Sequence, residues 1–210
     1  GLRLYGCRPF LSMREYILIN YQLCIAENIL LSREWEKFAV QDSLKEKIFE
    51  LYWKRPASRF YGTYHTKVEQ SDSRLLANNA DIVTVDSDWY IGHVLNMETS
   101  AGIALIIQQL FYTHAVQRQI IQFHSSLIDF RGHGLMFLGP SGIGKTTQAE
   151  LWNQYRDALI INGDIVFVQE TKGTFLGWGT PWHGSSPYCE NTNVPVDALI
   201  VLKQDEENSI

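Results

Sequence analysis

The stretch GLMFLGPSGIGKTTQAELW, residues 134–152, predicts a strand, a glycine-rich loop and a helix in direct succession. The loop, residues 139–146, satisfies the pattern G-x-x-x-x-G-K-[ST] in full. Its glycines allow successive backbone N–H groups to point at phosphates, Lys145 supplies a cation, and the Thr146 hydroxyl can ligate Mg²⁺. We therefore expect a nucleotide phosphate site rather than a purely structural turn. The predicted phosphate-binding residues are Gly139, Pro140, Ser141, Gly142, Ile143, Gly144, Lys145, Thr146 and Thr147.

The flanking residues predict further strands. Residues 123–130 and 134–139 flank RGHG, residues 131–134, whose two glycines can adopt the positive φ of a tight hairpin. After the helix, residues 158–162 and 164–170 are short apolar runs of the kind buried in a sheet that is covered on both faces. A turn at TKGT, the strand-like FLGWG and a final strand near residues 198–201 complete this half.

Asp164 is the first candidate partner of the loop. It follows an apolar run and lies 18 residues beyond Thr146 (164 − 146), which leaves room for one helix and one strand. A carboxylate there can hold Mg²⁺ or accept a proton from an acceptor hydroxyl. The alternative is that Asn162-Gly163-Asp164 forms only a turn.

His124 is the second candidate. By strand alternation it shares a face with Ser126, Ile128 and Phe130. Taken alone, a histidine at a strand edge is more often structural than functional.

Residues 179–195 predict a long loop without apolar periodicity. Trp182, His183 and Tyr188 favour an ordered lid or an acceptor surface, because loops of this length in compact domains are usually functional or disordered. An exposed connection with two packed aromatic residues is an equally open interpretation.

The first half of the chain predicts a mostly β module. Short segments rich in aromatic and β-branched residues are separated by Asp, Asn, Ser and Pro. The predicted strands are residues 15–20, 35–40, 47–53, 59–69, 81–86 and 89–94. Residues 101–119 switch to helical periodicity, with His114 as a core or edge residue. We place the domains at 13–115, which includes this linking helix, and 116–210.

The composition limits the partners and the compartment. Net charge is −5 and no Lys/Arg-rich block is present, which disfavours nucleic acid. Apolar runs fall well short of the roughly 20 residues that span a bilayer, so we expect no membrane partner. Cys7, Cys24 and Cys189 show neither zinc spacing nor a disulfide framework, which favours the cytoplasm. Residues 1–12 resemble an upstream extension, and the chain ends as if truncated.

The segment FHSSLIDFRGHGLMFLGPSGIGKTT, residues 123–147, resembles the catalytic core of bacterial HPr kinase/phosphorylase. In that family a histidine lies 15 residues before the first loop glycine, as His124 lies before Gly139 here. The hairpin that leads into the loop is shared with phosphoenolpyruvate carboxykinases. The motifs INGD and GTPWHGSS are similar to those of HPr-kinase-like bacterial proteins, some of which phosphorylate a serine of a precursor peptide. The resemblance covers roughly residues 110–210.

The resemblance implies an α/β fold, with a P-loop domain of the HPr kinase/carboxykinase type preceded by a smaller, mostly β module. It implies that Lys145 binds phosphate, that Thr146 and Asp164 hold Mg²⁺, and that His124 lies near the transferred phosphate. Asp164, His124 and Lys145 are the expected catalytic residues. In the family two adjacent acids usually follow this strand, whereas here Gly163 precedes Asp164.

The residues and the resemblance together leave three candidate functions. The first is a kinase that depends on Mg²⁺ and on ATP or another nucleoside triphosphate and that phosphorylates a Ser or Thr hydroxyl of a protein or peptide. The second is a nucleotide-binding regulatory module with weak or no transfer activity. Carboxykinase-type chemistry ranks last, because no convincing set of additional metal ligands is present. A homo-oligomer is compatible with the sequence.

Overall fold

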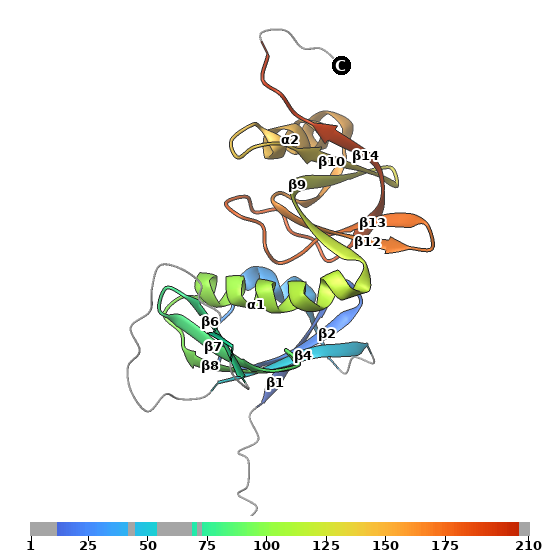
Figure 1. The fold of residues 1–210 in the computed structure, drawn as a ribbon. Coiled ribbons are helices and arrows are strands. Elements are labelled where there is room, and N and C mark those ends of the chain that lie inside the picture. The colour runs from blue at the N-terminus through green and yellow to red at the C-terminus, as the bar shows by residue number, and fades with distance from the viewer. Residues whose placement is uncertain (1–11, 42–44, 54–68, 71–72, 206–210) are drawn as a thin grey trace, which may run out of the picture. The chain divides into compact units, whose positions relative to one another are not determined.

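The computed structural model describes residues 12–41, 45–53, 69–70 and 73–205 of the chain (Figure 1). It divides into two compact units. Unit 1 comprises residues 1–33 and 39–110, and unit 2 comprises residues 34–38 and 111–210. The division follows Leu110, whereas the sequence placed it after residue 115. Helix α1 (Ser100–Ala115) therefore begins in unit 1 and ends in unit 2. With mixed sheets and helices, the fold is α/β in the broad sense.

Unit 1 is built on an eight-stranded sheet with the order β3-β1-β2-β4-β8-β7-β6-β5. Its central pairings, β2 with β4 and β4 with β8, are parallel, and the other pairings are antiparallel. Figure 1 shows α1 lying across one face of this sheet. The strands are β1 (Met13–Leu18), β2 (Tyr21–Ala26), β3 (Ala39–Val40), β4 (Glu46–Trp53), β5 (Glu69–Gln70), β6 (Ser73–Asn78), β7 (Asp81–Asp86) and β8 (Ile91–Asn96).

Three predicted strands of unit 1 form at β1, β4 and β7, and a fourth, β8, begins two residues later than expected. Only Ala39–Val40 of the predicted strand at 35–40 forms a strand, β3; the rest is wrong, because it belongs to the 3₁₀ helix η1 (Arg33–Phe38). The side chains of Trp35 and Phe38 are buried there at non-alternating positions, so tertiary packing overrides their β propensity. Most of the predicted strand at 59–69 lies outside the described residues.

The start of α1 follows from a buried carboxylate. Asp81 Oδ1 accepts hydrogen bonds from the backbone N–H groups of Glu98 and Thr99, and Asp81 Oδ2 accepts one from the Thr99 hydroxyl. Thr99 Oγ1 in turn accepts from the N–H of Gly102 at 2.9 Å, the usual N-cap arrangement. The predicted stripe is confirmed, since Ile103, Ile106, Ile107, Leu110 and Phe111 are buried. His114 is half-buried near the end of the helix, as predicted for an edge position.

Unit 2 contains a sheet that closes on itself. The long strand β9 pairs with β12 through its first half and with β10 through its second half. Strand β14 pairs in parallel with β10, and β13 joins β14 to β12. These pairings form a ring of five strands, with β11 beside the second half of β9. The elements are η2 (Val116–Arg118), β9 (Ile120–Phe130), β10 (His133–Leu138), α2 (Lys145–Arg156), β11 (Leu159–Asn162), β12 (Ile165–Thr171), β13 (Thr174–Trp178) and β14 (Asn193–Val201).

The hairpin between β9 and β10 forms as predicted but with a different turn. Its two central residues are Arg131 and Gly132, with φ of 57° and 86°. Gly134 has no positive φ and pairs within β10, where an added Cβ would overlap the backbone oxygen of Pro195. The second glycine of RGHG therefore serves close strand packing rather than the turn.

Two apolar clusters hold unit 2 together. The first comes from the ring strands β9, β10, β12 and β14 and from β11: Leu127, Met136, Ile161, Val166, Val168 and Val194. The second packs α2 against the outside of the ring through Ala149, Ile128 and Phe137. The rings of Phe130 and Trp152 meet edge to face at 5.2 Å in the same layer. Val166, Phe167 and Val168 are all buried, which confirms that both faces of β12 are covered.

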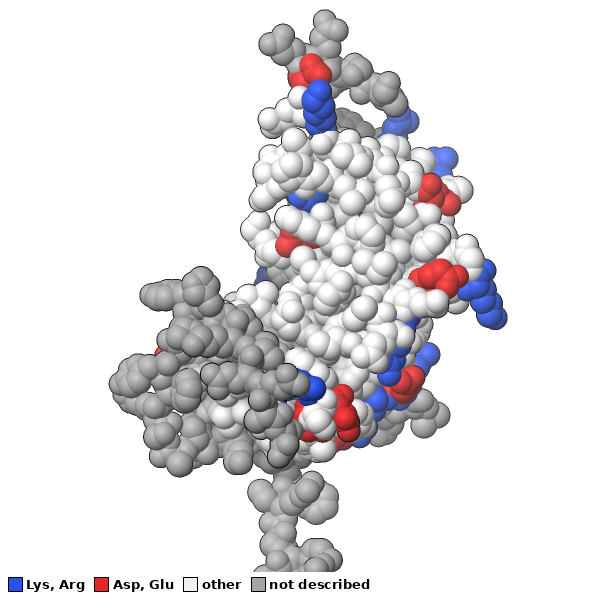
Figure 2. Space-filling view, viewed as in Figure 1, with Lys and Arg blue, Asp and Glu red and all other residues white. Residues whose placement is uncertain are grey.

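The described residues contain no helix that is both long enough and apolar enough to span a bilayer. On the face presented in Figure 2, lysine and arginine side chains lie singly or beside acidic ones rather than in one basic patch.

Candidate functional site

The loop of residues 139–144 connects the end of β10 to the start of α2. Three of its glycines have positive φ, namely 143° at Gly139, 79° at Gly142 and 105° at Gly144. No atom lies within 4 Å of an ideal Cβ at Gly142, so the tip of the loop is open. An L side chain is strained at these backbone angles, which accounts for the spacing of the glycines. The loop therefore wraps in front of the N-terminus of α2, a position suited to an anion.

Lys145 is the first residue of α2 and is buried. Its ammonium group donates hydrogen bonds to the backbone oxygens of Gly139 at 3.0 Å and Pro140 at 3.1 Å. The charge thus lies at the inner side of the loop, held by two of its three N–H donors. Lys145 lies at the start of the helix that follows the loop, and its predicted contact with phosphate stays a prediction.

Two hydroxyl groups hold the start of α2 against the neighbouring strands. Ser126, fully buried on β9, donates to the backbone oxygen of Lys145 at 2.8 Å. Thr146 Oγ1 donates to the backbone oxygen of Gly163 at 3.1 Å. Sequence analysis gave no role to Ser126, although alternation placed it on the same face as His124. Together these bonds bring β9, the residues before β12 and the loop to one place.

His124 and Asp164 meet beside this loop. His124 Nε2 lies 2.8 Å from Asp164 Oδ1, and the two side chains are 51% and 28% exposed. The β9–β12 register pairs His124 with Ile165, and the N–H of Ser125 donates to the backbone oxygen of Asp164 at 2.9 Å. Strand pairing therefore joins two candidates that stand 40 residues apart (164 − 124). The structure brings both close to Thr146, whose hydroxyl bonds to the residue before Asp164, while the catalytic roles that the resemblance implies for them stay predictions.

Gly163 has no space for a side chain. An ideal Cβ at this position would overlap the Ser186 hydroxyl oxygen and lie 2.9 Å from Ser186 Cβ. On the other side of the carboxylate, an ideal Cβ at Gly184 would overlap Asp164 Oδ2. The chain segment 184–186 thus packs directly against residues 163 and 164. This packing gives a physical reason for a single acid at this position.

The connection between β13 and β14, residues 179–192, is ordered and packed. Trp182 is buried, and its ring lies 5.6 Å from the ring of Trp35 in η1 and 6.0 Å from that of Phe167. The Lys37 ammonium donates to the backbone oxygen of Cys189 at 2.8 Å and to Glu190 Oε1 at 2.6 Å. Tyr188 donates to Glu150 Oε1 at 3.2 Å, and burial raises the pKa of its phenol. The loop therefore has a defined position beside Asp164, while its part in binding stays a prediction.

His183 closes a tight turn within this connection. Its ring nitrogen Nδ1 is bonded to the backbone oxygen of Ser186, and the Ser186 hydroxyl donates to the backbone oxygen of His183 at 2.9 Å. His183 Nε2 lies 3.9 Å from Glu34 Oε2 in η1. The side chain of His183 therefore supports the turn rather than pointing at Asp164.

The described cysteines, Cys24 and Cys189, are free and buried. Burial raises the pKa of both thiols above the ordinary value of 9.0. Neither cysteine contributes a thiolate near Asp164.

The oxygen atoms at the site fit a magnesium ion bound together with a nucleotide. Thr146 supplies a hydroxyl and Asp164 a carboxylate, both hard oxygen donors. The described part of the chain contains no group of three or more His, Cys, Asp or Glu side chains that could hold a metal ion. Mg²⁺ in phosphoryl-transfer sites takes one or two protein ligands and completes its shell with phosphate oxygens and water. Two protein donors are therefore sufficient.

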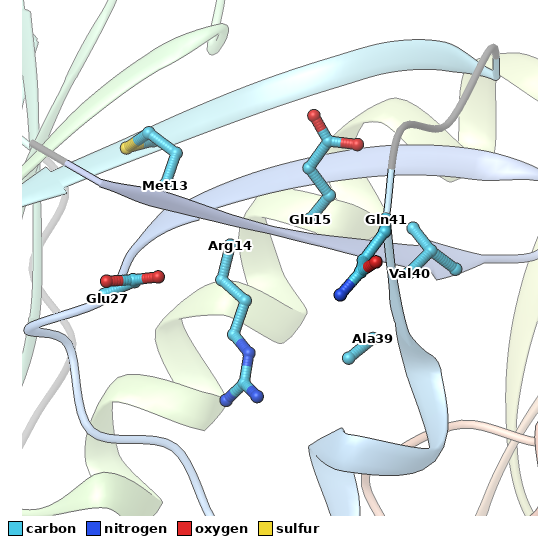
Figure 3. Close-up of a pocket in the computed structure, with 7 residues that line it drawn as sticks. All are labelled: Met13, Arg14, Glu15, Glu27, Ala39, Val40 and Gln41. Carbon is cyan, nitrogen blue, oxygen red and sulfur yellow. The ribbon is translucent and has the colours of Figure 1, made fainter.

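Two further pockets lie away from these residues. A polar pocket of about 600 Å³ in unit 1 is bordered by Arg14, Glu15, Glu27 and Gln41 (Figure 3). A mainly apolar pocket of about 240 Å³ in unit 2 lies beside Phe123, Phe175, Val196 and Leu199. Sequence analysis had singled out neither pocket.

Comparison with known proteins gives no match, either to a protein-family model or to a curated protein. The features of the chain that bear on its function are the glycine-rich loop, the buried lysine and the histidine–carboxylate pair that the fold brings together.

Proposed function

We propose that the chain is an ATP- and Mg²⁺-dependent kinase of the HPr kinase type, which transfers the γ-phosphoryl group to a Ser or Thr hydroxyl of a protein or peptide. The observation that carries this proposal is the His124–Asp164 pair at 2.8 Å, which lies next to a loop that ends in Lys145 and Thr146. A phosphate-binding loop alone is compatible with many functions. A paired carboxylate beside it adds a proton acceptor.

The loop residues would bind the triphosphate of ATP. Backbone N–H groups of residues 139–146 and the N-terminus of α2 offer donors and a positive dipole end to anionic oxygens. The Lys145 ammonium offers its third donor and a full charge, while two bonds to the loop keep it in position. When bound, Mg²⁺ neutralises charge on the phosphate oxygens, and Thr146 and Asp164 are the residues that would hold it.

Asp164 would accept the proton of the acceptor hydroxyl. As the hydroxyl oxygen forms its bond to the γ-phosphorus, the bond from that phosphorus to the ADP oxygen breaks, and ADP leaves. The proton of the hydroxyl moves to the Asp164 carboxylate. His124 Nε2 contacts Oδ1 of this carboxylate and so orients it, which leaves Oδ2 on the side of Gly184. The absence of a side chain at Gly184 keeps the connecting loop from colliding with that oxygen.

The single acid also favours a second function, a nucleotide-binding module with little or no transfer activity. Ser186 occupies the space that a side chain at position 163 would need. The single carboxylate of Asp164 would therefore have to bind the metal and also accept the proton of the acceptor hydroxyl. In that case a variant without the Asp164 carboxylate would bind ATP as tightly as the wild-type chain, and neither protein would form a phosphorylated product.

The decisive experiment combines ATP binding with phosphoryl transfer. Binding of ATP, with and without Mg²⁺, is measured by calorimetry, and transfer from γ-³²P-ATP is measured with a library of serine- and threonine-containing peptides and with water as the acceptor. We expect Lys145→Ala to weaken ATP binding by about 10- to 100-fold, because a charge-assisted hydrogen bond contributes roughly 1.5–3 kcal/mol. We expect Asp164→Asn to keep ATP binding in the absence of Mg²⁺ and to lower kcat by about 10²- to 10⁴-fold.

Unit 2 offers a matched control in a second histidine–carboxylate pair. His133 Nδ1 lies 2.8 Å from Asp197 Oδ2, on β10 and β14. His133 begins β10 whereas the loop follows its last residue, so the pair lies about 16 Å away along the strand. Asp197→Asn should leave transfer unchanged. Full activity in Asp164→Asn, or equal losses in both variants, would contradict the assigned role.

A further inference from the structure

Asn162 is a buried polar residue that sequence analysis treated only as part of a turn. It is the last residue of β11, and its side chain is fully buried. Its strand neighbours, Ile160 and Ile161, are apolar and buried, so an amide at this position requires hydrogen-bond partners. The structure supplies partners for both ends of the amide.

The oxygen of this amide holds the backbone of the acid. Asn162 Oδ1 accepts hydrogen bonds from the N–H groups of Asp164 at 2.8 Å and Ile165 at 2.9 Å. The bond to the residue two positions on is an Asx-turn, so the turn expected for NGD does form. The backbone of Asp164 is therefore fixed on both sides. Its N–H donates to Asn162 Oδ1, and its carbonyl oxygen accepts from the N–H of Ser125.

The nitrogen of the same amide holds the connecting loop. Asn162 Nδ2 donates to the backbone oxygens of Thr180 at 3.0 Å and Trp182 at 3.1 Å. The Thr180 hydroxyl donates to the backbone oxygen of Ile165 at 2.8 Å and closes the connection from the other side. Two residues beyond Trp182, the loop reaches Gly184 and its contact with Asp164 Oδ2.

We propose that Asn162 is a positioning residue of the transfer site, whose amide fixes Asp164 and the loop of residues 180–186 relative to each other. The inference rests on the proposed function. It assigns to Asn162 the task of setting the distance between Asp164 and the loop of residues 180–186. Displacement of a reacting group by about 1 Å can cost about 100-fold in rate. An asparagine suits this task because it presents an acceptor to two N–H groups and a donor to two carbonyls. A carboxylate at 162 would face the oxygens of Thr180 and Trp182 and repel them.

The test uses variants that separate the two ends of the amide. Asn162→Ala removes both sets of bonds, and Asn162→Asp keeps the acceptor for the N–H groups of residues 164 and 165. Thr180→Val removes the bond from the Thr180 hydroxyl to the backbone oxygen of Ile165, and leaves the bonds of Asn162 to the backbone oxygens of Thr180 and Trp182 in place. Asn153→Ala is the matched control, because Asn153 Nδ2 also donates to a backbone oxygen, that of Ala158 at 2.8 Å, without contacting Asp164. The full chain is assayed for kcat, KM for ATP and amide hydrogen exchange.

We expect Asn162→Ala to lower kcat by about 10- to 100-fold at an unchanged KM for ATP, and to speed exchange at the amides of residues 164 and 165. Asn162→Asp should restore the protection of these two amides and part of kcat. Thr180→Val should lower kcat less than Asn162→Ala and leave the amide of residue 164 protected. It therefore tests the second link between the loop and the residues after Asn162, the Thr180–Ile165 bond, even if Asn162→Ala does not fold.

Wild-type kcat and exchange in Asn162→Ala, or an equal loss of kcat in Asn153→Ala, would overturn the inference. Hydrogen exchange separates the two proposals. If the wild-type chain transfers no phosphate, the proposed function fails. The positioning role is then decided by whether exchange at 164 and 165 rises in Asn162→Ala and stays unchanged in Asn153→Ala.

Discussion

The packing of Ser186 against Gly163 yields a prediction that can be worked through in free energy. The change is Gly163→Ala, alone and combined with Ser186→Gly. Gly163 has no positive φ, so an alanine meets no backbone strain. Its cost arises only from the Ser186 hydroxyl and from Ser186 Cβ, which lies 2.9 Å from the position of the new methyl group.

The size of the loss in stability depends on how the Ser186 side chain and its loop must move to make room for the new methyl group. Rotating the Ser186 hydroxyl away breaks its bond to the backbone oxygen of His183, which contributes about 0.5–1.5 kcal/mol. The contact with Ser186 Cβ remains after rotation and forces a shift of the loop. Overpacking of this kind typically costs about 1–3 kcal/mol. The two costs add, so we expect Gly163→Ala to lower the free energy of unfolding by about 1.5–4.5 kcal/mol.

Unfolding in urea is monitored by tryptophan fluorescence. The wild type, Gly163→Ala, Ser186→Gly and the double variant are compared in a double-mutant cycle. In the Ser186→Gly background the new methyl group has space, so the cost of Gly163→Ala should fall by at least about 1 kcal/mol. The reasoning is refuted if Gly163→Ala is as stable as the wild type, or if its cost is the same in both backgrounds.

Two other predictions concern buried side chains. Trp35→Ala should lower the free energy of unfolding of unit 2, measured in urea, by about 3–5 kcal/mol, because the 1% exposed ring of Trp35 packs on Trp182. The control Lys37→Gln should lower it by less than about 1 kcal/mol. Equal losses in the two variants would contradict this packing. Burial raises the pKa of the Cys24 and Cys189 thiols above 9.0, the value expected in the unfolded chain. Well below pH 9 both states keep these protons, and as the pH approaches and passes 9 the unfolded chain loses them first. The free energy of unfolding should therefore fall as pH rises above 9, and a Cys24→Ala/Cys189→Ala variant measured from pH 8 to 10.5 should decline less steeply; an identical slope would refute the assignment.

Local sequence was sufficient for the loop and the elements beside it. The glycine spacing at 139, 142 and 144 requires backbone angles that few other residues adopt, and these φ values occur. Apolar periodicity located α1 and most strands, because exposure and burial repeat with the geometry of each element. Strands β2 and β6 were missed, since residues such as Gln22, Ala26 and Ala77 have weak β propensity and are held in place by their partners.

The sequence by itself determined the loop, Lys145 at its end and the identity of the candidate acid, since each depends on residues close together in the chain. Only the tertiary structure decided that β9 pairs with β12 so that His124 reaches Asp164, and that Asn162 and Ser186 occupy the space around that acid. It also placed η1, which is distant in sequence, against Trp182. Contacts of this kind depend on strand register and side-chain packing across long chain separations, and no local pattern encodes either.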